Sequence, residues 1–335
     1  MTDMTTTLAG IAFPNPVFTA SGCAAAGREL DQFFDVAQIG GVVTKSIMLA
    51  ARSGRATPRM AETPSGMLNS IGLQGPGIEE FLRKDLAWLE QRGARAVVSI
   101  AGGSVEDYTS LAQKLRGHPA VSMIEVNISC PNVEDRGHVF ACDPRASSGV
   151  VQAVRQNTAK GTPVFAKLSP DVTDITTIAR ACVDAGADGL SVINTLLGMV
   201  IDTTTMRPAL AGVTGGLSGP AIRPVAVRCV WQVHQALPDV PILGMGGIRT
   251  GLDALEFVLA GASAVSVGTT VFGDPTAPVR VLAELEQALA SRGIDKLSDA
   301  VGLAHRPPEP FVPERPDPVG DEPVPSYEDA FEEQS

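Results

Sequence analysis

Aromatic side chains are scarce in this sequence and make up only 4% of its 335 residues. A large core is still expected, because 44% of the residues are hydrophobic. That core has to be built from Ala, Val, Leu and Ile, which suit closely packed layers of strands and helices. The length is too great for one small core and fits one large barrel domain.

Three further absences narrow the class of protein. No window holds about 18 uninterrupted apolar residues, so we expect no membrane span. Residues 1–8 carry neither a basic nor an apolar segment, which excludes a secretory signal peptide. The cysteines form no C-x-x-C pair, which argues against a zinc site or iron–sulfur cluster in this chain, and their odd number fits a reducing cytoplasm. They are Cys23, Cys130, Cys142, Cys182 and Cys229.

An excess of positive charge is also missing, since the formal net charge is −11. Residues 306–335 hold nine acidic, two basic and eight proline residues, so the rest of the chain is only mildly acidic. This balance is poor for binding nucleic acid. The proline-rich acidic segment is predicted to be a disordered tail after a single domain at residues 1–305.

Eight apolar runs recur along the domain, and each ends in a polar or glycine-rich patch. Amphipathic segments lie between them, at 76–89, 174–185, 251–260, 276–290 and after Pro220. Eight strands alternating with helices indicate a (β/α)₈ barrel, and a doubly wound sheet is the alternative. The runs begin near Val17, Val42, Ala96, Ile124, Val164, Leu190, Ile242 and Ala264.

Three stretches break this repeat, at residues 50–75, 133–148 and 203–219. Each follows a predicted strand, so all three are expected at the carboxyl end of the barrel, where active sites of this fold form. Long loops there are commonly lids, although simple length variation explains any one of them equally well.

Glycines and lysines follow several of the strands. Gly246, Gly247, Gly268 and Thr269 come after the last two runs, where backbone N–H groups can approach a phosphate. Lys45 and Lys167 indicate an anion or a cofactor that gains negative charge, although such lysines can also be rim residues. Asn69, Asn127, Asn132 and Asn194 suit a planar heterocycle with alternating C=O and N–H groups.

The stretch 124–132 places a thiol, Cys130, between two carboxamides at a strand end. A reaction site is one interpretation, and a small core cysteine is the other.

Several motifs together make the sequence resemble the dihydroorotate dehydrogenases, flavoproteins of pyrimidine synthesis. Each motif alone is modest evidence, but their order and spacing match along most of the chain, from Ala20 to about Phe272. They are Thr44-Lys45-Ser46, Met67-Leu68-Asn69-Ser70-Ile71-Gly72-Leu73-Gln74, Asn127-Ile128-Ser129-Cys130-Pro131-Asn132, Ala166-Lys167-Leu168-Ser169-Pro170, Ile193-Asn194-Thr195, Gly215-Gly216-Leu217-Ser218-Gly219-Pro220, Gly244-Met245-Gly246-Gly247 and Val267-Gly268-Thr269.

The resemblance implies one FMN per chain and oxidation of dihydroorotate to orotate, with Cys130 as the base. Ser99 stands where the family pattern implies a flavin-contacting Asn. The implied flavin-binding residues are Ser21, Lys45, Ser46, Asn127, Lys167, Ile193, Gly219, Gly246, Gly247, Gly268 and Thr269. The implied substrate-binding residues are Lys45, Asn69, Ser70, Ile71, Gly72, Leu73, Asn127, Asn132, Asn194 and Thr195.

The motifs resemble most the NAD-linked class, whose catalytic chain forms a homodimer core and pairs with a subunit carrying FAD and a 2Fe–2S cluster. The alternatives are a fumarate-linked homodimer and a dihydropyrimidine dehydrogenase-like flavoprotein. A phosphate-binding barrel isomerase or lyase, and a flavin-free scaffold subunit, remain hypotheses from other classes. No metal, nucleic-acid or membrane binding is expected.

Overall fold

The computed structural model describes residues 2–128 and 142–307. Residues 1–305 form one compact unit, and the chain from Arg306 onward is a separate one. Almost all of that second unit lies outside the described residues, so the disordered tail and the single-domain boundary at 305 stay predictions. Cys130, Asn132 and most of the stretch 133–148 also lie outside them.

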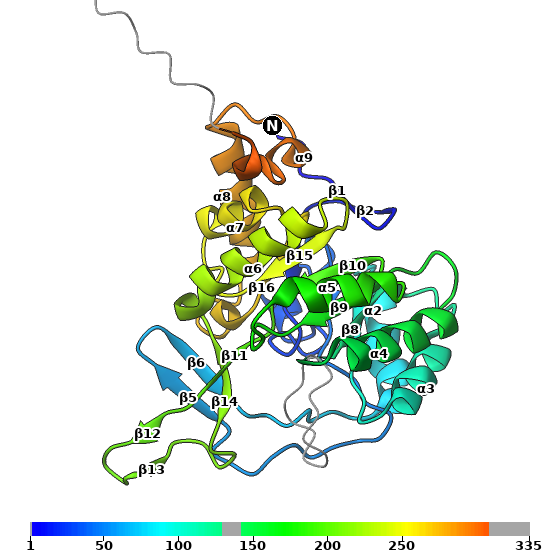
Figure 1. The fold of residues 1–335 in the computed structure, drawn as a ribbon, viewed down its shortest axis with the longest axis vertical. Helices are drawn as coiled ribbons and strands as arrows, with labels where there is room; N and C mark the ends of the chain where they lie inside the picture. Colours follow the sequence, from blue (N-terminus) through cyan, green and yellow to red (C-terminus); the bar gives the residue numbers. More distant parts are fainter. Residues whose placement is uncertain (1, 129–141, 308–335) are drawn as a thin grey trace, which may run out of the picture. The chain divides into compact units, whose positions relative to one another are not determined.

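Eight parallel strands form the centre of the fold (Figure 1). A bridge between Phe18 and Gly41 brings the first and last strands of the sheet together, so the sheet is a nearly closed barrel. This confirms the predicted (β/α)₈ barrel and rules out the doubly wound sheet. In spatial order the strands are β3 (Val17–Thr19), β16 (Ala264–Val267), β15 (Ile242–Met245), β10 (Gly189–Val192), β9 (Val164–Leu168), β8 (Val121–Asn127), β7 (Ala96–Ile100) and β4 (Val42–Val43).

Burial on both faces explains why these strands read as continuous apolar runs. Every residue of β9, β10, β15 and β16 is buried. The N-terminal hairpin of β1 (Thr6–Leu8) and β2 (Ile11–Phe13) places Leu8 and Phe13 in one core cluster with Phe18 and Phe165. The hairpin therefore packs together with Val97, Met123 and Leu243 of the barrel strands.

Helices surround the barrel, and successive pairs such as α3 with α4 and α7 with α8 pack against each other (Figure 1). The five predicted helices are confirmed, the first with a π-helical stretch at Phe81–Leu86. The helices are α1 (Ile78–Glu80), α2 (Ala87–Gln91), α3 (Val105–Leu115), α4 (Pro144–Asn157), α5 (Ile175–Asp184), α6 (Arg223–Ala236), α7 (Gly251–Leu259), α8 (Ala277–Ala290) and α9 (Leu297–Ala300).

Local chemistry sets the helix starts. The side chain of Asp174 accepts from the Thr176 amide before α5, and a capping box of Thr250 and Asp253 opens α7. Asp143 caps α4 in the same way, with Pro144 in its first turn. The loop predicted over residues 133–148 is therefore wrong for its last five residues, which are helical.

The two remaining insertions meet in a second, antiparallel sheet (Figure 1). The register pairs Asn69 with Gly216 and Leu68 with Leu217, so segments far apart in sequence form one layer. Because both insertions follow barrel strands, this layer lies at the carboxyl end of the barrel. Its strands are, in order, β11 (Leu196–Gly198), β14 (Gly215–Ser218), β6 (Gly66–Asn69) and β5 (Met60–Thr63), and β12 (Ile201–Asp202) pairs with β13 (Arg207–Pro208).

Within residues 2–128 and 142–307, the structure contains no helix with the length and apolar character needed to cross a bilayer.

Candidate functional site

Two adjoining cavities open at the carboxyl ends of the barrel strands, with volumes of about 390 and 350 Å³. They share lining residues, so one elongated ligand or two stacked ligands could occupy them together. The shared residues are Ser21, Cys23, Asn194, Thr195, Ser218 and Thr269.

The first cavity is lined by eight of the residues predicted to bind the cofactor. Its glycines let the backbone at Gly247 and the backbone at Gly219 approach each other closely. Gly247 has a φ of +79°, and a Cβ there would lie 2.7 Å from the carbonyl oxygen of Gly219. The eight residues are Ser21, Lys167, Ile193, Gly219, Gly246, Gly247, Gly268 and Thr269.

The second cavity gathers most of the residues predicted to bind the substrate. Ser70 is an exception: it does not line either cavity, is buried, and accepts a hydrogen bond from Arg55 through its hydroxyl at 3.0 Å. Asn132 and the predicted base Cys130 lie outside the described residues. The predicted residues that line this cavity are Ser21, Lys45, Ser46, Asn69, Ile71, Gly72, Leu73, Asn127, Asn194, Thr195 and Thr269.

Lys167 lies in β9 and is almost fully buried. Its ammonium nitrogen is 3.4 Å from the Ser21 hydroxyl at the cavity wall and 3.9 Å from a carboxylate oxygen of Glu125. The register places Lys167 opposite Asn127 of β8. A cation is thereby fixed at the cavity with little water around it, where its charge acts strongly on a bound anion.

A chain of polar groups orients Asn127. Its side-chain nitrogen donates to the Ser46 hydroxyl at 2.9 Å, and Ser46 in turn lies 2.9 Å from the hydroxyl of Ser99. The Tyr108 hydroxyl donates to the Asn127 carbonyl at 2.7 Å. Ser99 is fully buried and is not among the residues lining either cavity, so it supports Ser46 instead of contacting a ligand there.

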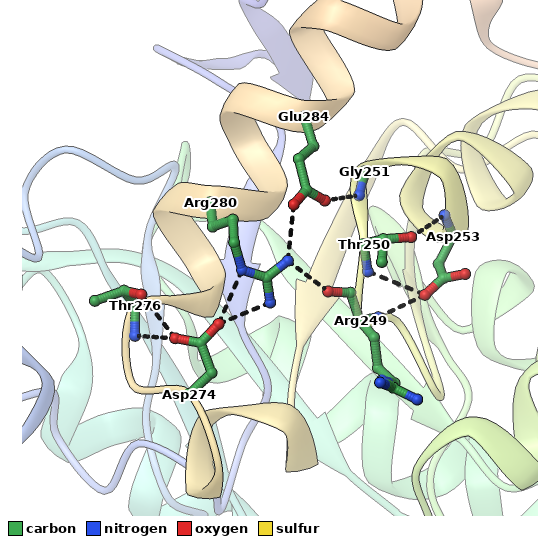
Figure 2. Close-up of polar contacts among 8 residues, drawn as sticks. All are labelled: Arg249, Thr250, Gly251, Asp253, Asp274, Thr276, Arg280 and Glu284. Atoms are coloured by element: carbon green, nitrogen blue, oxygen red, sulfur yellow. Dashed lines mark hydrogen bonds and ion pairs between the residues drawn. The ribbon is translucent and has the colours of Figure 1, made fainter.

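Polar and charged side chains join the segments that follow the two glycine loops of the predicted phosphate site (Figure 2). Arg280 of α8 binds the carboxylates of Asp274 and Glu284 and donates to the carbonyl of Arg249 at 3.1 Å. Arg249 lies two residues after Gly247, and its backbone amide donates a hydrogen bond to the Asp253 carboxylate at 2.8 Å. Asp274 follows the turn that begins at Gly268, so one guanidinium fixes both loops.

Charge pairing in this cluster shifts two pKa values. Hydrogen bonds from Thr276 and then from Arg280 lower the pKa of Asp274. The carboxylates of Glu284 and Asp274 raise the pKa of Arg280. At neutral pH Asp274 therefore stays negatively charged and Arg280 stays positively charged.

Cys23 and Arg55 are among the cavity residues that the sequence prediction missed. Cys23 lines both cavities, and burial raises the pKa of its thiol to about 11 despite the nearby ammonium groups of Lys167 and Lys45. Arg55 lines the second cavity, and its backbone amide donates to the Ile71 carbonyl at 3.0 Å. Arg55 lies in the part of the 50–75 insertion that precedes the motif at 67–74, so only the fold reveals its contact with the loop 69–73.

Comparison with known proteins assigns this chain to a family. Residues 3–289 match the family model described as dihydroorotate dehydrogenase. The chain belongs to the dihydroorotate dehydrogenase family.

Relatives within this family agree with that assignment along most of the chain. A protein of Geobacter sp. (strain M21) named dihydroorotate dehydrogenase B (NAD(+)), catalytic subunit, is 50% identical over 300 residues, which cover 90% of this chain and 97% of that protein. A protein of Desulforudis audaxviator with the same name is 51% identical over 299 residues, covering 89% and 96%. The structure of an Eimeria tenella dihydroorotate dehydrogenase in complex with ferulenol has a TM-score of 0.75 at 25% identity, covering 91% of this chain and 89% of that one.

Proposed function

We propose that this chain is the catalytic subunit of an NAD-linked dihydroorotate dehydrogenase, which oxidises dihydroorotate to orotate in the cytoplasm during pyrimidine biosynthesis. The main support is the pair of adjoining cavities, which gather the predicted cofactor residues on one side and the predicted substrate residues on the other. Family membership and the names of the relatives point to the same reaction.

The first cavity has features that fit one FMN. The Gly246–Gly247 and Gly268–Thr269 loops suit its phosphate, and the ammonium group of Lys167 suits its pyrimidine edge. Ser266 also lines the cavity, and its buried hydroxyl has no hydrogen-bond partner among the described residues, as expected for a wall that meets a polar ligand. When bound, FMN would supply the acceptor for a hydride from the substrate.

The second cavity would hold dihydroorotate next to that flavin. Asn69, Asn127 and Asn194 offer donors and acceptors to the planar ring, and Lys45 offers a positive charge. Cys130 would take the proton from C5 of dihydroorotate. This role for Cys130 is supported by the sequence motif alone. A thiol has an ordinary pKa of about 8.5, so a neighbouring positive group has to favour the thiolate.

The proposal includes a partner. The sequence has no C-x-x-C pair, so the FAD and 2Fe–2S cluster implied for the NAD-linked class would belong to a second subunit attached to a homodimer of this chain. The fumarate-linked homodimer is the second candidate for the acceptor.

An acceptor assay separates the two. The isolated, flavin-loaded chain should oxidise dihydroorotate with an artificial dye and leave NAD unreduced. NAD reduction should appear when the co-purified partner subunit is present. Rapid turnover with fumarate by a homodimer lacking the partner would overturn the NAD-linked assignment, and absence of dihydroorotate oxidation with every acceptor would overturn the reaction itself.

A further inference from the structure

A carboxylate is buried inside the barrel beneath the site. Glu125 lies in β8 with no exposed surface, two residues before Asn127 and therefore on the same face of the strand. Neither of its carboxylate oxygens has a hydrogen-bond partner among the described residues. Burying such a group without hydrogen bonds is costly, so its presence here needs a reason beyond packing.

Lys167 is the cationic group that the structure places against this carboxylate. The distance from its nitrogen to Oε1 of Glu125 is 3.9 Å, and the two side chains are 5% and 0% exposed. Lys167 lines the first cavity and contacts Ser21 there, whereas Glu125 lines neither cavity. The ammonium group therefore has the cavity on one side and a fixed negative charge on the other.

We propose that Glu125 is a positioning residue that acts through Lys167. Its carboxylate holds the ammonium group at the cavity and offsets part of the positive charge that Lys167 presents to the ligand. The inference rests on the proposed function, because the ligand next to Lys167 is taken to be FMN. Glu125 would thereby keep Lys167 from over-stabilising the reduced, more negative form of the cofactor.

The reduction potential of bound FMN tests this directly. Glu125→Gln keeps the shape of the side chain and removes its charge, so the uncompensated ammonium should favour the reduced form. We expect the ratio of affinities for reduced over oxidised FMN to rise about tenfold, equivalent to about +30 mV for a two-electron couple. If Glu125→Gln does not give folded holoenzyme, Glu125→Met carries the same expectation, because it removes the same charge and its apolar side chain has a similar length.

Ser191→Ala is the matched control. Ser191 lies in β10 opposite Lys167, is fully buried, and has no described hydrogen-bond partner for its hydroxyl. This variant disturbs packing next to Lys167 without changing a charge, so the potential should stay at the wild-type value. An unchanged potential in the Glu125 variant, or an equal shift in Ser191→Ala, would overturn the proposal.

A thermal-stability cycle tests whether Glu125 acts through Lys167. Lys167→Met should lower the melting temperature, because it leaves a buried carboxylate without its opposite charge. Adding Glu125→Gln to Lys167→Met should recover part of the lost melting temperature. If Lys167→Met alone does not fold but the double variant does, that also counts as recovery. Strictly additive losses would contradict the pairing. Wild-type protein that binds no FMN would instead refute the proposed function, so the two failures are distinguishable.

Discussion

Asn127 of the barrel donates through its side-chain nitrogen to the hydroxyl of Ser46 at 2.9 Å, across 81 positions of sequence. This bond fixes which way the carboxamide faces in the second cavity. Because Asn127 is predicted to contact both flavin and substrate, its orientation matters for both ligands.

Ser46→Ala should weaken substrate binding. The change removes the acceptor for Asn127, and a buried hydrogen bond contributes about 0.5–1.5 kcal/mol, so KM for dihydroorotate should rise roughly threefold to tenfold. Ser99→Ala should have a smaller effect, since Ser46 still contacts Asn127. Steady-state kinetics with a dye acceptor measures both, and an effect of Ser99→Ala larger than that of Ser46→Ala would contradict this order.

Arg55→Ala should also raise KM with little change in protein stability. Arg55 supports the loop 69–73 through its side chain on Ser70, and its side chain also packs against Gly72. Loss of a hydrogen bond from a charged group amounts to about 1.5–3 kcal/mol when buried, and partial exposure reduces this. Arg52→Ala is the control, because Arg52 is an exposed arginine of the same insertion. Equal effects of the two variants would exclude a specific role for Arg55.

Arg280→Ala should weaken FMN binding without direct contact to the cofactor. Arg280 joins the segments after β15 and β16 through Arg249 and Asp274 (Figure 2), so its loss frees both glycine loops. The FMN dissociation constant should rise roughly threefold to tenfold, as for the loss of one or two partly exposed charged hydrogen bonds. Arg292→Ala, just beyond the end of α8, is the control, since its side chain bonds only to Ala288 and Ser291 among the described residues. Fluorescence titration of the apoprotein with FMN measures the constant, and equal losses in both variants would contradict this explanation.

The thiol of Cys23 should alkylate slowly at neutral pH. Burial raises its pKa to about 11, so the reactive thiolate forms only in strongly alkaline solution. Because the folded-state pKa is the higher one, the associated stability is present below the unfolded pKa and is lost as pH rises through the folded value. Peptide mapping after timed alkylation at several pH values follows Cys23 separately from the other cysteines. Labelling at pH 8 as fast as that of a free thiol would show that the thiol is not protected.

The barrel was predictable because its strands carry their own signal. Buried parallel strands are apolar throughout, so runs such as 164–168 and 264–267 stand out in the sequence. Helix α4 was missed because Gly149 and two serines weaken its local preference, and its apolar residues reveal a pattern only after Gly149. The antiparallel layer was missed because β6 and β14 are short, glycine-containing strands that pair across about 150 residues of chain.

The candidate site was predictable to the extent that strand ends mark it. Lys167 lies near the end of β9, and Asn194, Gly246, Gly247 and Gly268 follow barrel strands. The fold brings all of them to the same end. The contacts of Ser99 with Ser46 and of Glu125 with Lys167 depend on the register between strands, which the sequence does not express. Arg280 lies 31 residues beyond Arg249, so its contact with that loop required the packing of α8.

Anaerobic mixing of the flavin-loaded protein with dihydroorotate tests the central claim most directly. The yellow absorbance of oxidised FMN should bleach rapidly in the wild-type protein as orotate forms. Cys130→Ser should bind FMN equally well but bleach about 10²–10⁴ times more slowly at neutral pH, because an alkoxide forms far less readily than a thiolate. Bleaching at the wild-type rate in Cys130→Ser would remove Cys130 from the base role, and a wild-type flavin that stays oxidised in excess dihydroorotate would contradict the proposed reaction.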